Sequence, residues 1–339
     1  MRGHGFRSLG GAYFCTLSNC SRISSVPTSS KDQPIIAVAG PTASGKTALG
    51  VFLGEELGGE VVNFDSVQIY RGIEIATAKP TAEERRGIPH HLIDYVDPNI
   101  DYTAADWAKD AEAKIREIES HKKRVILVGG TGFYLRTLCR PLFESPKTDP
   151  KLREKYRKLH AEHGPEYLHA MLAKFDPQAA ENLPVRDHVR VIRALEVIEQ
   201  TGQQISVLQP ERPEPPDFAE RISLVVLSPP RDILYEKINA RTLEHFDAGL
   251  VDEVRRLLAD GVRENGNALG AHAYRRVCEY LRGERSLENA IEKSQQDVRN
   301  YAKRQLTWFR KESKAVWFEG FGGDREVAAK VLKYVNNIA

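Results

Sequence analysis

The sequence has few cysteines, no long apolar run and almost no excess of either charge. Four cysteines scattered over 339 residues exclude a disulfide framework and a four-ligand zinc site, and they favour a reducing compartment. No apolar run approaches the roughly 20 residues of a membrane span, so we expect no membrane partner. Lys and Arg number 49 against 47 Asp and Glu, so a polyanionic partner would have to be recognised by local basic clusters.

The remaining composition, 41% hydrophobic and 28% charged, is that of a globular protein, and the length suggests about two domains. Residues 1–33 differ from the rest: they contain seven serines, four Arg or Lys and a single acid, Asp32. We expect this leader not to fold. Its composition fits an organelle transit peptide, a disordered tail or an over-extended start of the chain.

Alternating strand and helix patterns begin at Pro34. The runs 35–39, 60–64 and 124–128 are too uniformly apolar for exposed antiparallel strands and indicate buried parallel ones. A helix begins after Thr103, where Asp106 completes a capping box. Its apolar stripe consists of Trp107, Ala111, Ile115 and Ile118. These units predict an α/β protein with a doubly wound, mostly parallel sheet. Together with the phosphate-binding loop described below, they indicate a sheet of the P-loop NTPase-like kind.

After residue 144 the pattern changes. Residues 145–217 are charged, helical in period and Pro-rich at their end, which indicates a helical insertion domain. A β-rich run at 221–227 then resumes the sheet, and the chain from there to about residue 310 reads as helical. We therefore divide the core domain into 34–144 and 218–339, on either side of the insertion.

The sharpest motif lies between the first strand and a helix that begins near Lys46. It matches G-x-x-x-x-G-K-[ST], the phosphate-binding loop. In such a loop the backbone N–H groups face an anion at the helix N-terminus, Lys46 adds a charge, and the Thr47 hydroxyl is a ligand for Mg²⁺. A Gly-rich turn that fits by chance is the structural alternative. The predicted anion-binding residues are Gly40, Thr42, Ala43, Ser44, Gly45, Lys46 and Thr47.

The third apolar run lacks the terminal Asp that holds magnesium in many phosphate-loop kinases and NTPases; it ends in Gly129, Gly130, Thr131 and Gly132. An acid follows the second strand instead, at Asp65. At the carboxyl end of a parallel strand beside the loop, that side chain faces the crevice. This arrangement argues against a nucleotide or metabolite kinase.

Seven segments in order resemble the tRNA dimethylallyltransferase (tRNA isopentenyltransferase) family. They are GPTASGKT, DSVQIY, TAKP, the Pro-His-His at 89–91, GGTGFYL, RVIRALEV with the following Thr-Gly at 201–202, and YAKRQLTWFR. The resemblance covers residues 34 to about 318. It implies transfer of a dimethylallyl group from dimethylallyl diphosphate to N6 of adenosine 37, next to the tRNA anticodon, so that the loop holds diphosphate with Mg²⁺ as cofactor.

The resemblance also implies roles for single residues. Asp65 accepts the N6 proton, Thr131 contacts the reacting groups, and Lys46 and Arg241 hold the diphosphate. The adenine has to be flipped out of its stack to reach the loop. For Asp65 the structural alternative is a cap or turn residue, and for Thr131 it is a strand-to-helix cap.

The implied tRNA contacts include Asp65 and Thr131. Ser66 and Gln68 read the target base, and Val67 is a further tRNA contact. Two basic arrays are candidates for binding RNA: Arg186, Arg190 and Arg193 on one helix face, and Arg299, Lys303, Arg304 and Arg310 among aromatic residues. By themselves such arrays are more often solvated helix faces, and the family-matched segments favour RNA binding. The family-matched contacts are Arg153, Val189, Arg190, Val191, Ile192 and Arg193, and then Gly270, Ala271, His272, Ala273, Tyr274 and Arg275.

Two positions depart from the family pattern, where Ala76 and Ala273 replace glycine; each is tolerable if φ is negative there. His90 and His91 invite a metal assignment, but without further ligands nearby we expect them to form hydrogen bonds. The chain ends soon after TWFR without the zinc finger of eukaryotic members, which favours a cytoplasmic, bacterial-type enzyme; the alternative is an organelle enzyme if residues 1–33 are a transit peptide. The resemblance implies a monomer. Two alternatives remain: an adenylate isopentenyltransferase acting on free nucleotide, and a non-catalytic tRNA-binding protein.

Overall fold

The computed structural model describes residues 33–338. The expectations for the first 32 residues of the leader lie outside this range. Within it, no helix combines the length and the apolar character that crossing a bilayer requires.

A six-stranded sheet forms the centre of the molecule, in the order β3-β2-β4-β1-β5-β6, and every neighbouring pair is parallel. The strands are β1 (Ile35–Ala39), β2 (Gly59–Asn63), β3 (His90–His91), β4 (Arg124–Val128), β5 (Ile222–Ser228) and β6 (Val316–Glu319). The predicted parallel sheet is confirmed, with its first three strands placed to within one residue. The edge strands β3 and β6 were not predicted, since they are short and only partly buried.

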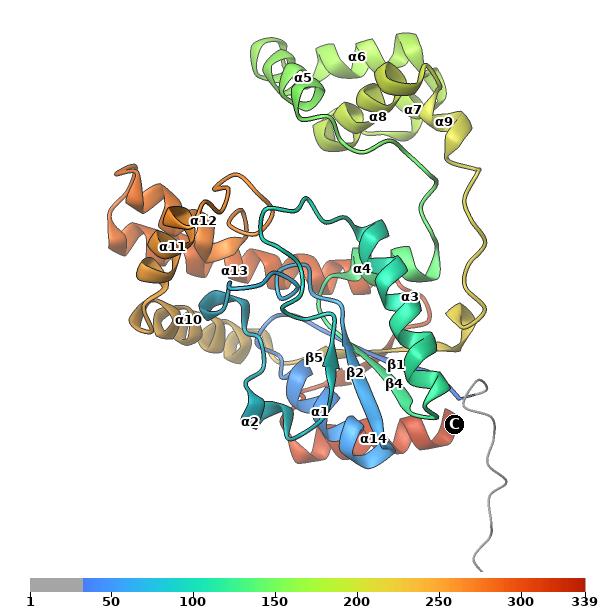
Figure 1. The fold of residues 1–339 in the computed structure, drawn as a ribbon, viewed down its shortest axis with the longest axis vertical. Coiled ribbons are helices and arrows are strands. Elements are labelled where there is room, and N and C mark those ends of the chain that lie inside the picture. Colours follow the sequence, from blue (N-terminus) through green and yellow to red (C-terminus); the bar gives the residue numbers. More distant parts are fainter. Residues whose placement is uncertain (1–32, 339) are drawn as a thin grey trace, which may run out of the picture.

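Helices cover both faces of the sheet, which is the doubly wound arrangement (Figure 1). On one face α1 (Lys46–Leu57) and α14 (Arg325–Ile338) pack through Leu49, Leu53 and Val331 against inner strand residues. The opposite face is covered by α3 (Ala104–Ser120), α4 (Gly132–Cys139), α11 (Leu250–Ala259) and α12 (His272–Leu281). The larger hydrophobic core lies on this second face.

The helix predicted after Thr103 is confirmed together with its capping box. Thr103 Oγ1 accepts from the Asp106 backbone N–H at 3.2 Å, and Asp106 Oδ2 accepts from the Thr103 backbone N–H at 3.0 Å. All four residues of the predicted stripe are buried, and Trp107 Nε1 donates to the carbonyl of Asn63 in β2 at 3.0 Å. The helix is therefore fixed against the strand that leads to Asp65.

The helices within the region 145–217 form a unit with its own hydrophobic core, which includes Tyr156, Leu168, Leu172 and Leu195. They are α5 (Pro150–His163), α6 (Pro165–Phe175), α7 (Pro177–Asn182), α8 (His188–Thr201) and α9 (Ile205–Leu208). Figure 1 shows this helical unit standing apart from the sheet, joined to it by two extended segments. The core of the sheet and the core of the helical unit share no residue.

The other helices surround the carboxyl ends of the strands. They are α2 (Ala82–Arg85), α10 (Arg231–Asp247) and the 23-residue α13 (Leu287–Phe309), with the short 3₁₀ turn η2 (Ile75–Thr77). A second 3₁₀ turn, η3 (Ala219–Arg221), lies instead at the amino end of β5. Helices α10 and α13 pack against each other, and α13 also packs against α12 and α4. Several elements distant in sequence thus meet beside the loop between β1 and α1.

Candidate active site

The loop between β1 and α1 has the backbone of a phosphate cradle. Gly45 is the N-cap of α1 in a left-handed conformation with φ of 83°, and Ala43 also has a positive φ, 62°. A Cβ atom at Gly45 would lie 2.9 Å from the backbone nitrogens of Gly322 and Gly323, so both conformation and space require glycine there. Ser44 is fully buried, and its Oγ has no hydrogen-bond partner among residues 33–338.

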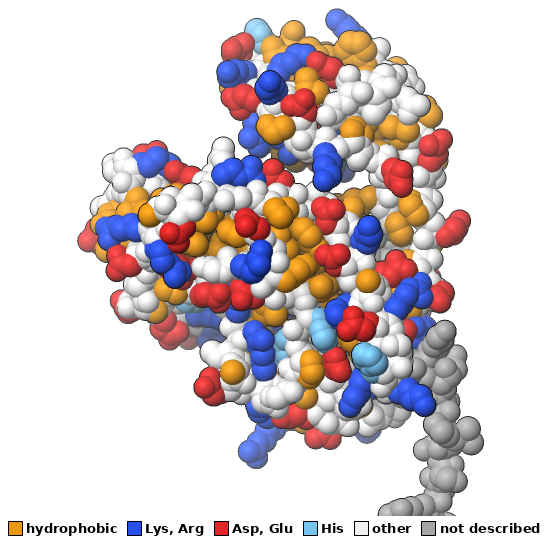
Figure 2. Space-filling view, in the orientation of Figure 1, with side chains coloured by type: hydrophobic (Ala, Val, Ile, Leu, Met, Phe, Trp, Pro, Cys, Tyr) orange, Lys and Arg blue, Asp and Glu red, His pale blue; other side chains and the backbone are white. Residues whose placement is uncertain are grey.

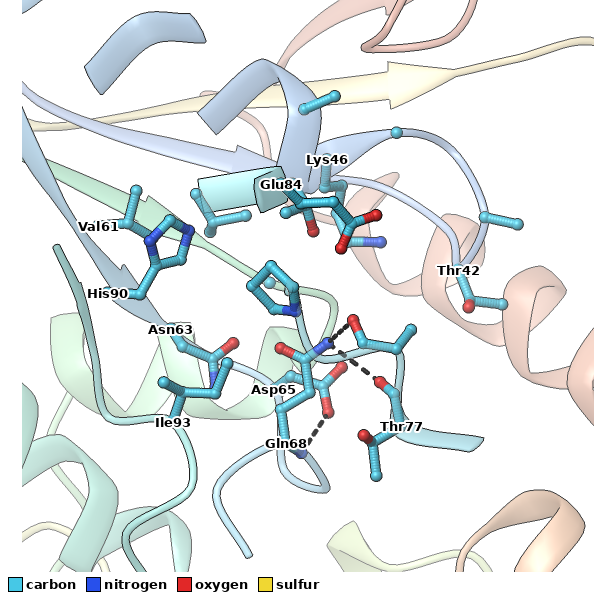
Figure 3. Close-up of a pocket in the computed structure, with 18 of the residues that line it drawn as sticks. Thr42, Lys46, Val61, Asn63, Asp65, Gln68, Thr77, Glu84, His90 and Ile93 are labelled. Atoms are coloured by element: carbon cyan, nitrogen blue, oxygen red, sulfur yellow. Dashed lines mark hydrogen bonds between the residues drawn. The ribbon is translucent and has the colours of Figure 1, made fainter. Parts of the chain in front are cut away.

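A cavity of about 350 Å³ opens in front of this loop (Figure 3). It is lined by the loop and helix residues Thr42, Ala43, Gly45, Lys46 and Thr47, by Asp65, Gln68 and Thr77 from the next strand end, and by Glu84, His90, Arg241 and Gln305. Five of the seven predicted loop residues therefore line one cavity with Asp65 and Arg241, whereas Gly40 and Ser44 are not in its lining. Arg241 is almost 200 positions away from the loop in sequence.

Two cations face this cavity without forming a salt bridge to any residue of 33–338. Lys46 Nζ donates to the carbonyl of Pro41 at 2.6 Å, and burial lowers the pKa of Lys46 to about 8, with Asp65 opposing and Arg241 adding to the shift. Burial also lowers the pKa of Arg241, on α10. Two desolvated cations beside oriented amides make a site for a multiply charged anion.

Asp65 lies just beyond the end of β2, and one of its oxygens organises the turn that follows. Asp65 Oδ1 accepts from the backbone N–H groups of Val67 at 2.9 Å and Gln68 at 3.3 Å. The interpretation of Asp65 as a turn residue is thus confirmed. Its carboxylate also lines the cavity, so the turn holds the group in place for a second function.

Thr131 occupies the N-cap position of α4, but its side chain caps nothing in that helix. Its Oγ1 instead accepts from the backbone N–H of Ser66 at 3.0 Å and lies 3.3 Å from Ser66 Oγ, to which it donates. The interpretation as a helix cap is therefore wrong for the hydroxyl. The bond joins the tip of β4 to the turn that carries Asp65.

Two further hollows continue from the first cavity. A narrow one of about 60 Å³ shares Thr42, Asp65 and Arg241 with it and is lined on its other sides mainly by apolar groups such as Ile238, Ala273 and Val298. A wider one of about 520 Å³ shares residues with the narrow one, and its lining includes four tyrosines and Arg304. The narrow and the wide hollow share Val67, Ala271, His272 and Tyr301. The hollows run from a cationic end, through a small apolar chamber, to an aromatic and polar opening.

Gln68 was expected to read a base, but its amide nitrogen is already committed. Gln68 Nε2 donates to the carbonyls of Thr77 at 3.0 Å and Ala78 at 2.9 Å, which holds the TAKP segment against the site. The Gly-to-Ala departures fit the structure, because neither Ala76 nor Ala273 is among the residues with positive φ.

The segment 270–275 is only partly available for RNA. Ala273 and Tyr274 are buried. Tyr274 donates from its hydroxyl to Glu253 Oε1 at 2.8 Å and accepts from the Ala76 backbone N–H at 3.1 Å. The expectation that these two side chains contact tRNA is wrong, because they form the support beneath the site; Gly270 and Arg275 remain exposed.

In the helical unit the structure separates the family-matched contacts. Val191 and Ile192 are in the core, so their side chains cannot meet RNA, whereas Val189 and Arg190 are exposed. Arg186 lies in a turn before α8, and the single helix face predicted for it is wrong.

Arg153 is engaged within the helical unit. Its Nε and a terminal nitrogen donate to the two carboxylate oxygens of Glu196 at 2.8 and 3.0 Å, and Arg193 adds a contact at 3.3 Å. Since Glu196 has no exposed side-chain area, this pair joins α5 to α8 from the inside.

Sequence reasoning passed over Gln305, which lies inside the quoted YAKRQLTWFR segment. It is 4% exposed and contacts the phosphate loop. A glutamine on an otherwise apolar helix face was the available signal.

His90 and His91 form hydrogen bonds, as expected: His90 Nδ1 lies 2.8 Å from the Ile88 carbonyl and His91 Nε2 lies 2.7 Å from Glu60 Oε2. Between residues 33 and 338 no cluster of three or more His, Cys, Asp or Glu could hold a metal by itself. A magnesium ion would need oxygens from a bound anion. Thr47, in the first turn of α1 and on the cavity wall, fits that use.

Comparison with known proteins identifies the family of this chain. Residues 68–312 match the family model described as IPP transferase. A tRNA dimethylallyltransferase of Geobacter metallireducens is 44% identical over 300 residues, 88% of this chain and 97% of the relative.

Solved structures agree as well. The full-length tRNA isopentenylpyrophosphate transferase of Bacillus halodurans superposes with a TM-score of 0.65 at 37% identity, covering 90% of this chain and 95% of the other. A eukaryotic dimethylallyltransferase acting on tRNA shares the fold, with a TM-score of 0.73 at 24% identity over 91% of this chain and 80% of its own. Because the family model and the Geobacter metallireducens relative match most of its length, the chain belongs to the IPP transferase family, together with the tRNA dimethylallyltransferases.

Proposed function

We propose that this enzyme transfers a dimethylallyl group from dimethylallyl diphosphate to N6 of adenosine 37 in tRNA. The observation that carries the proposal is the continuous run of hollows that joins two unpaired cations, Lys46 and Arg241, to an opening rich in tyrosine, with Asp65 beside their junction. A diphosphate fits the first end, a five-carbon apolar group the small chamber, and a flipped base the other end.

The reaction forms a bond between adenine N6 and the allylic carbon and breaks the bond from that carbon to the diphosphate oxygen, which leaves with the electron pair. Lys46, Arg241 and the loop amides stabilise the charge that develops on the diphosphate. Asp65 accepts the proton released from N6 through the oxygen that is free of the turn. Thr131 holds the Ser66 backbone and so keeps the Asp65 turn at the tip of β4.

Bound Mg²⁺ adds positive charge to the leaving diphosphate, and the Thr47 hydroxyl together with diphosphate oxygens would hold the ion.

The RNA lies, in this proposal, between the core and the helical unit. Figure 2 shows a notch between these two parts, with Lys and Arg side chains on both of its sides. Arg304, exposed at the tyrosine-rich hollow, and Arg190, exposed on α8, are the basic residues best placed to bind phosphates. Val189, Gly270 and Arg275 complete the exposed surface in the family-matched segments.

We also propose that the enzyme is cytoplasmic and monomeric. The bacterial origin of the relatives supports the former, as do Cys139 and Cys278, which are free thiols.

The test is incorporation of labelled dimethylallyl diphosphate, with Mg²⁺, into an anticodon stem-loop carrying adenosine 37. We expect transfer to this RNA and none to a stem-loop with guanosine 37 or to free AMP. Transfer to AMP instead would assign the chain to the adenylate isopentenyltransferases, and tight stem-loop binding without any transfer would leave a tRNA-binding protein.

A further inference from the structure

One polar side chain joins the phosphate loop to the tip of the neighbouring strand. Gln305 Oε1 accepts from the backbone N–H of Thr42 at 2.8 Å, and its Nε2 donates to the carbonyl of Gly130 at 3.0 Å. Only one orientation of the amide group satisfies both partners, because an N–H requires the oxygen and a carbonyl requires the nitrogen. Both polar atoms of the Gln305 amide therefore have a defined partner.

The position of this contact is where the backbone pairing of the sheet stops. Strands β1 and β4 are in register up to Val38 and Val128, followed by a bond from the Gly129 N–H to the Val38 carbonyl. Beyond that point the two chains diverge into the phosphate loop and into α4. The Gln305 side chain replaces the next backbone bonds and closes the gap between Thr42 and Gly130.

The Gln305 amide packs closely against the backbone of Gly130. A Cβ atom at position 130 would lie 2.0 Å from Gln305 Nε2, so glycine is required there because of Gln305. Gln305 also lines the cavity in front of the phosphate loop.

The helix that carries Gln305 also reaches the acceptor side of the site. The hydroxyl of Tyr301, one turn earlier on α13, has Thr131 and Gln305 as polar neighbours, and its ring contacts that of His272 at a tilt of 52°, with ring centroids 4.3 Å apart. Arg304, the neighbour of Gln305, lines the tyrosine-rich hollow. One face of α13 thus touches the donor loop while adjacent residues face the proposed RNA.

We propose that Gln305 is a positioning residue that fixes the Thr42 end of the phosphate loop for diphosphate and links it, through Tyr301 and Thr131, to the adenosine side. The link to adenosine rests on the proposed function, whereas the control of diphosphate binding does not. Gln305 touches no reacting atom and acts through the Thr42 amide and the Gly130 carbonyl.

The test measures binding of inorganic diphosphate with Mg²⁺ by calorimetry, and steady-state kinetics, in Gln305→Met, which keeps the length of the side chain and removes both hydrogen bonds. We expect diphosphate affinity to fall about tenfold and the KM for dimethylallyl diphosphate to rise by a similar factor, while affinity for the anticodon stem-loop stays unchanged. The matched control is Gln296→Met, an exposed glutamine on the same helix, which should leave all three values unchanged.

A second variant, Gln305→Glu, carries the test if the Met variant does not fold. Its carboxylate can accept from Thr42 but repels the Gly130 carbonyl and the diphosphate; once protonated, it reproduces the donor and acceptor of the amide. The affinity ratio of variant to wild type should therefore recover as the pH is lowered.

Unchanged diphosphate affinity in Gln305→Met, equal losses of diphosphate and stem-loop affinity, or a pH-independent ratio in Gln305→Glu would overturn the proposal. Because diphosphate binding is measured without turnover, a wild-type enzyme that binds diphosphate but transfers nothing to the stem-loop would refute the proposed function separately.

Discussion

Lys46 Nζ donates a hydrogen bond to the Pro41 carbonyl oxygen, 2.6 Å away in the same loop. The ammonium group is thereby held over the loop before any anion arrives, so binding diphosphate requires little rearrangement of this side chain. The same burial that permits this contact makes the charge easier to lose, which lowers the pKa of Lys46 to about 8.

The pH dependence of the reaction should report this shift. Lys46 attracts diphosphate only when protonated, so kcat/KM for dimethylallyl diphosphate should be constant below pH 8 and fall as the pH rises through about 8. In Lys46→Arg the cation persists at every accessible pH, so the fall near pH 8 should disappear even if activity is lower. Rate profiles of the two proteins against pH provide the measurement, and a wild-type profile that stays flat well above pH 8 would contradict it.

Asp65 has a structural and a proposed chemical function that one substitution can separate. Asn in its place retains an oxygen that accepts from the Val67 N–H, so the turn should persist, while the base is lost. We expect kcat to fall by about 10² to 10⁴ with stem-loop affinity unchanged, as measured by single-turnover transfer and by RNA binding. Asp97→Asn is the matched control, because Asp97 makes the same kind of turn, with Asn99, outside the cavities. An active Asp65→Asn enzyme would remove Asp65 from the mechanism.

Arg153 should matter for stability rather than for RNA. In Arg153→Met the fully buried Glu196 loses its bidentate partner, and we expect a loss of about 3 kcal/mol in the free energy of unfolding. Lys158→Met removes an exposed pair with Glu154 on the same helix and should change stability by less than about 1 kcal/mol. Urea unfolding measures both. If Arg153→Met weakened stem-loop binding without lowering the free energy of unfolding, Arg153 would contact tRNA, as the sequence predicted.

Stem-loop binding should depend on salt through α13. Lys303 and Arg304 are both exposed, and removing both should weaken the RNA complex and reduce the slope of log affinity against log salt by about 1.4, at about 0.7 for each single-strand phosphate contact. Diphosphate affinity should not change. Lys330→Ala is the control, because α14 lies on the side of the sheet away from the helical unit in Figure 1. Titrations at several salt concentrations test this, and an unchanged slope in the double variant would exclude these residues from the interface.

The sequence by itself determined the elements that depend on local chemistry. The phosphate loop follows from glycines at fixed spacing, the capping box at Thr103 from two side chains three residues apart, and the buried strands from uninterrupted apolar runs. Asp65 was identifiable because the carboxyl end of a parallel strand has one direction in such a sheet.

Only the tertiary structure decided which polar side chains support the site and which remain free. Arg153 and Tyr274 were expected to contact RNA and Gln305 was assigned no function, yet their partners Glu196, Glu253 and Thr42 are 21 to 263 positions away. Burial turned them inward, because a buried polar group must find a partner wherever the fold brings one. No local pattern contains that partner, so the division between contact and support appears only once the chain has folded.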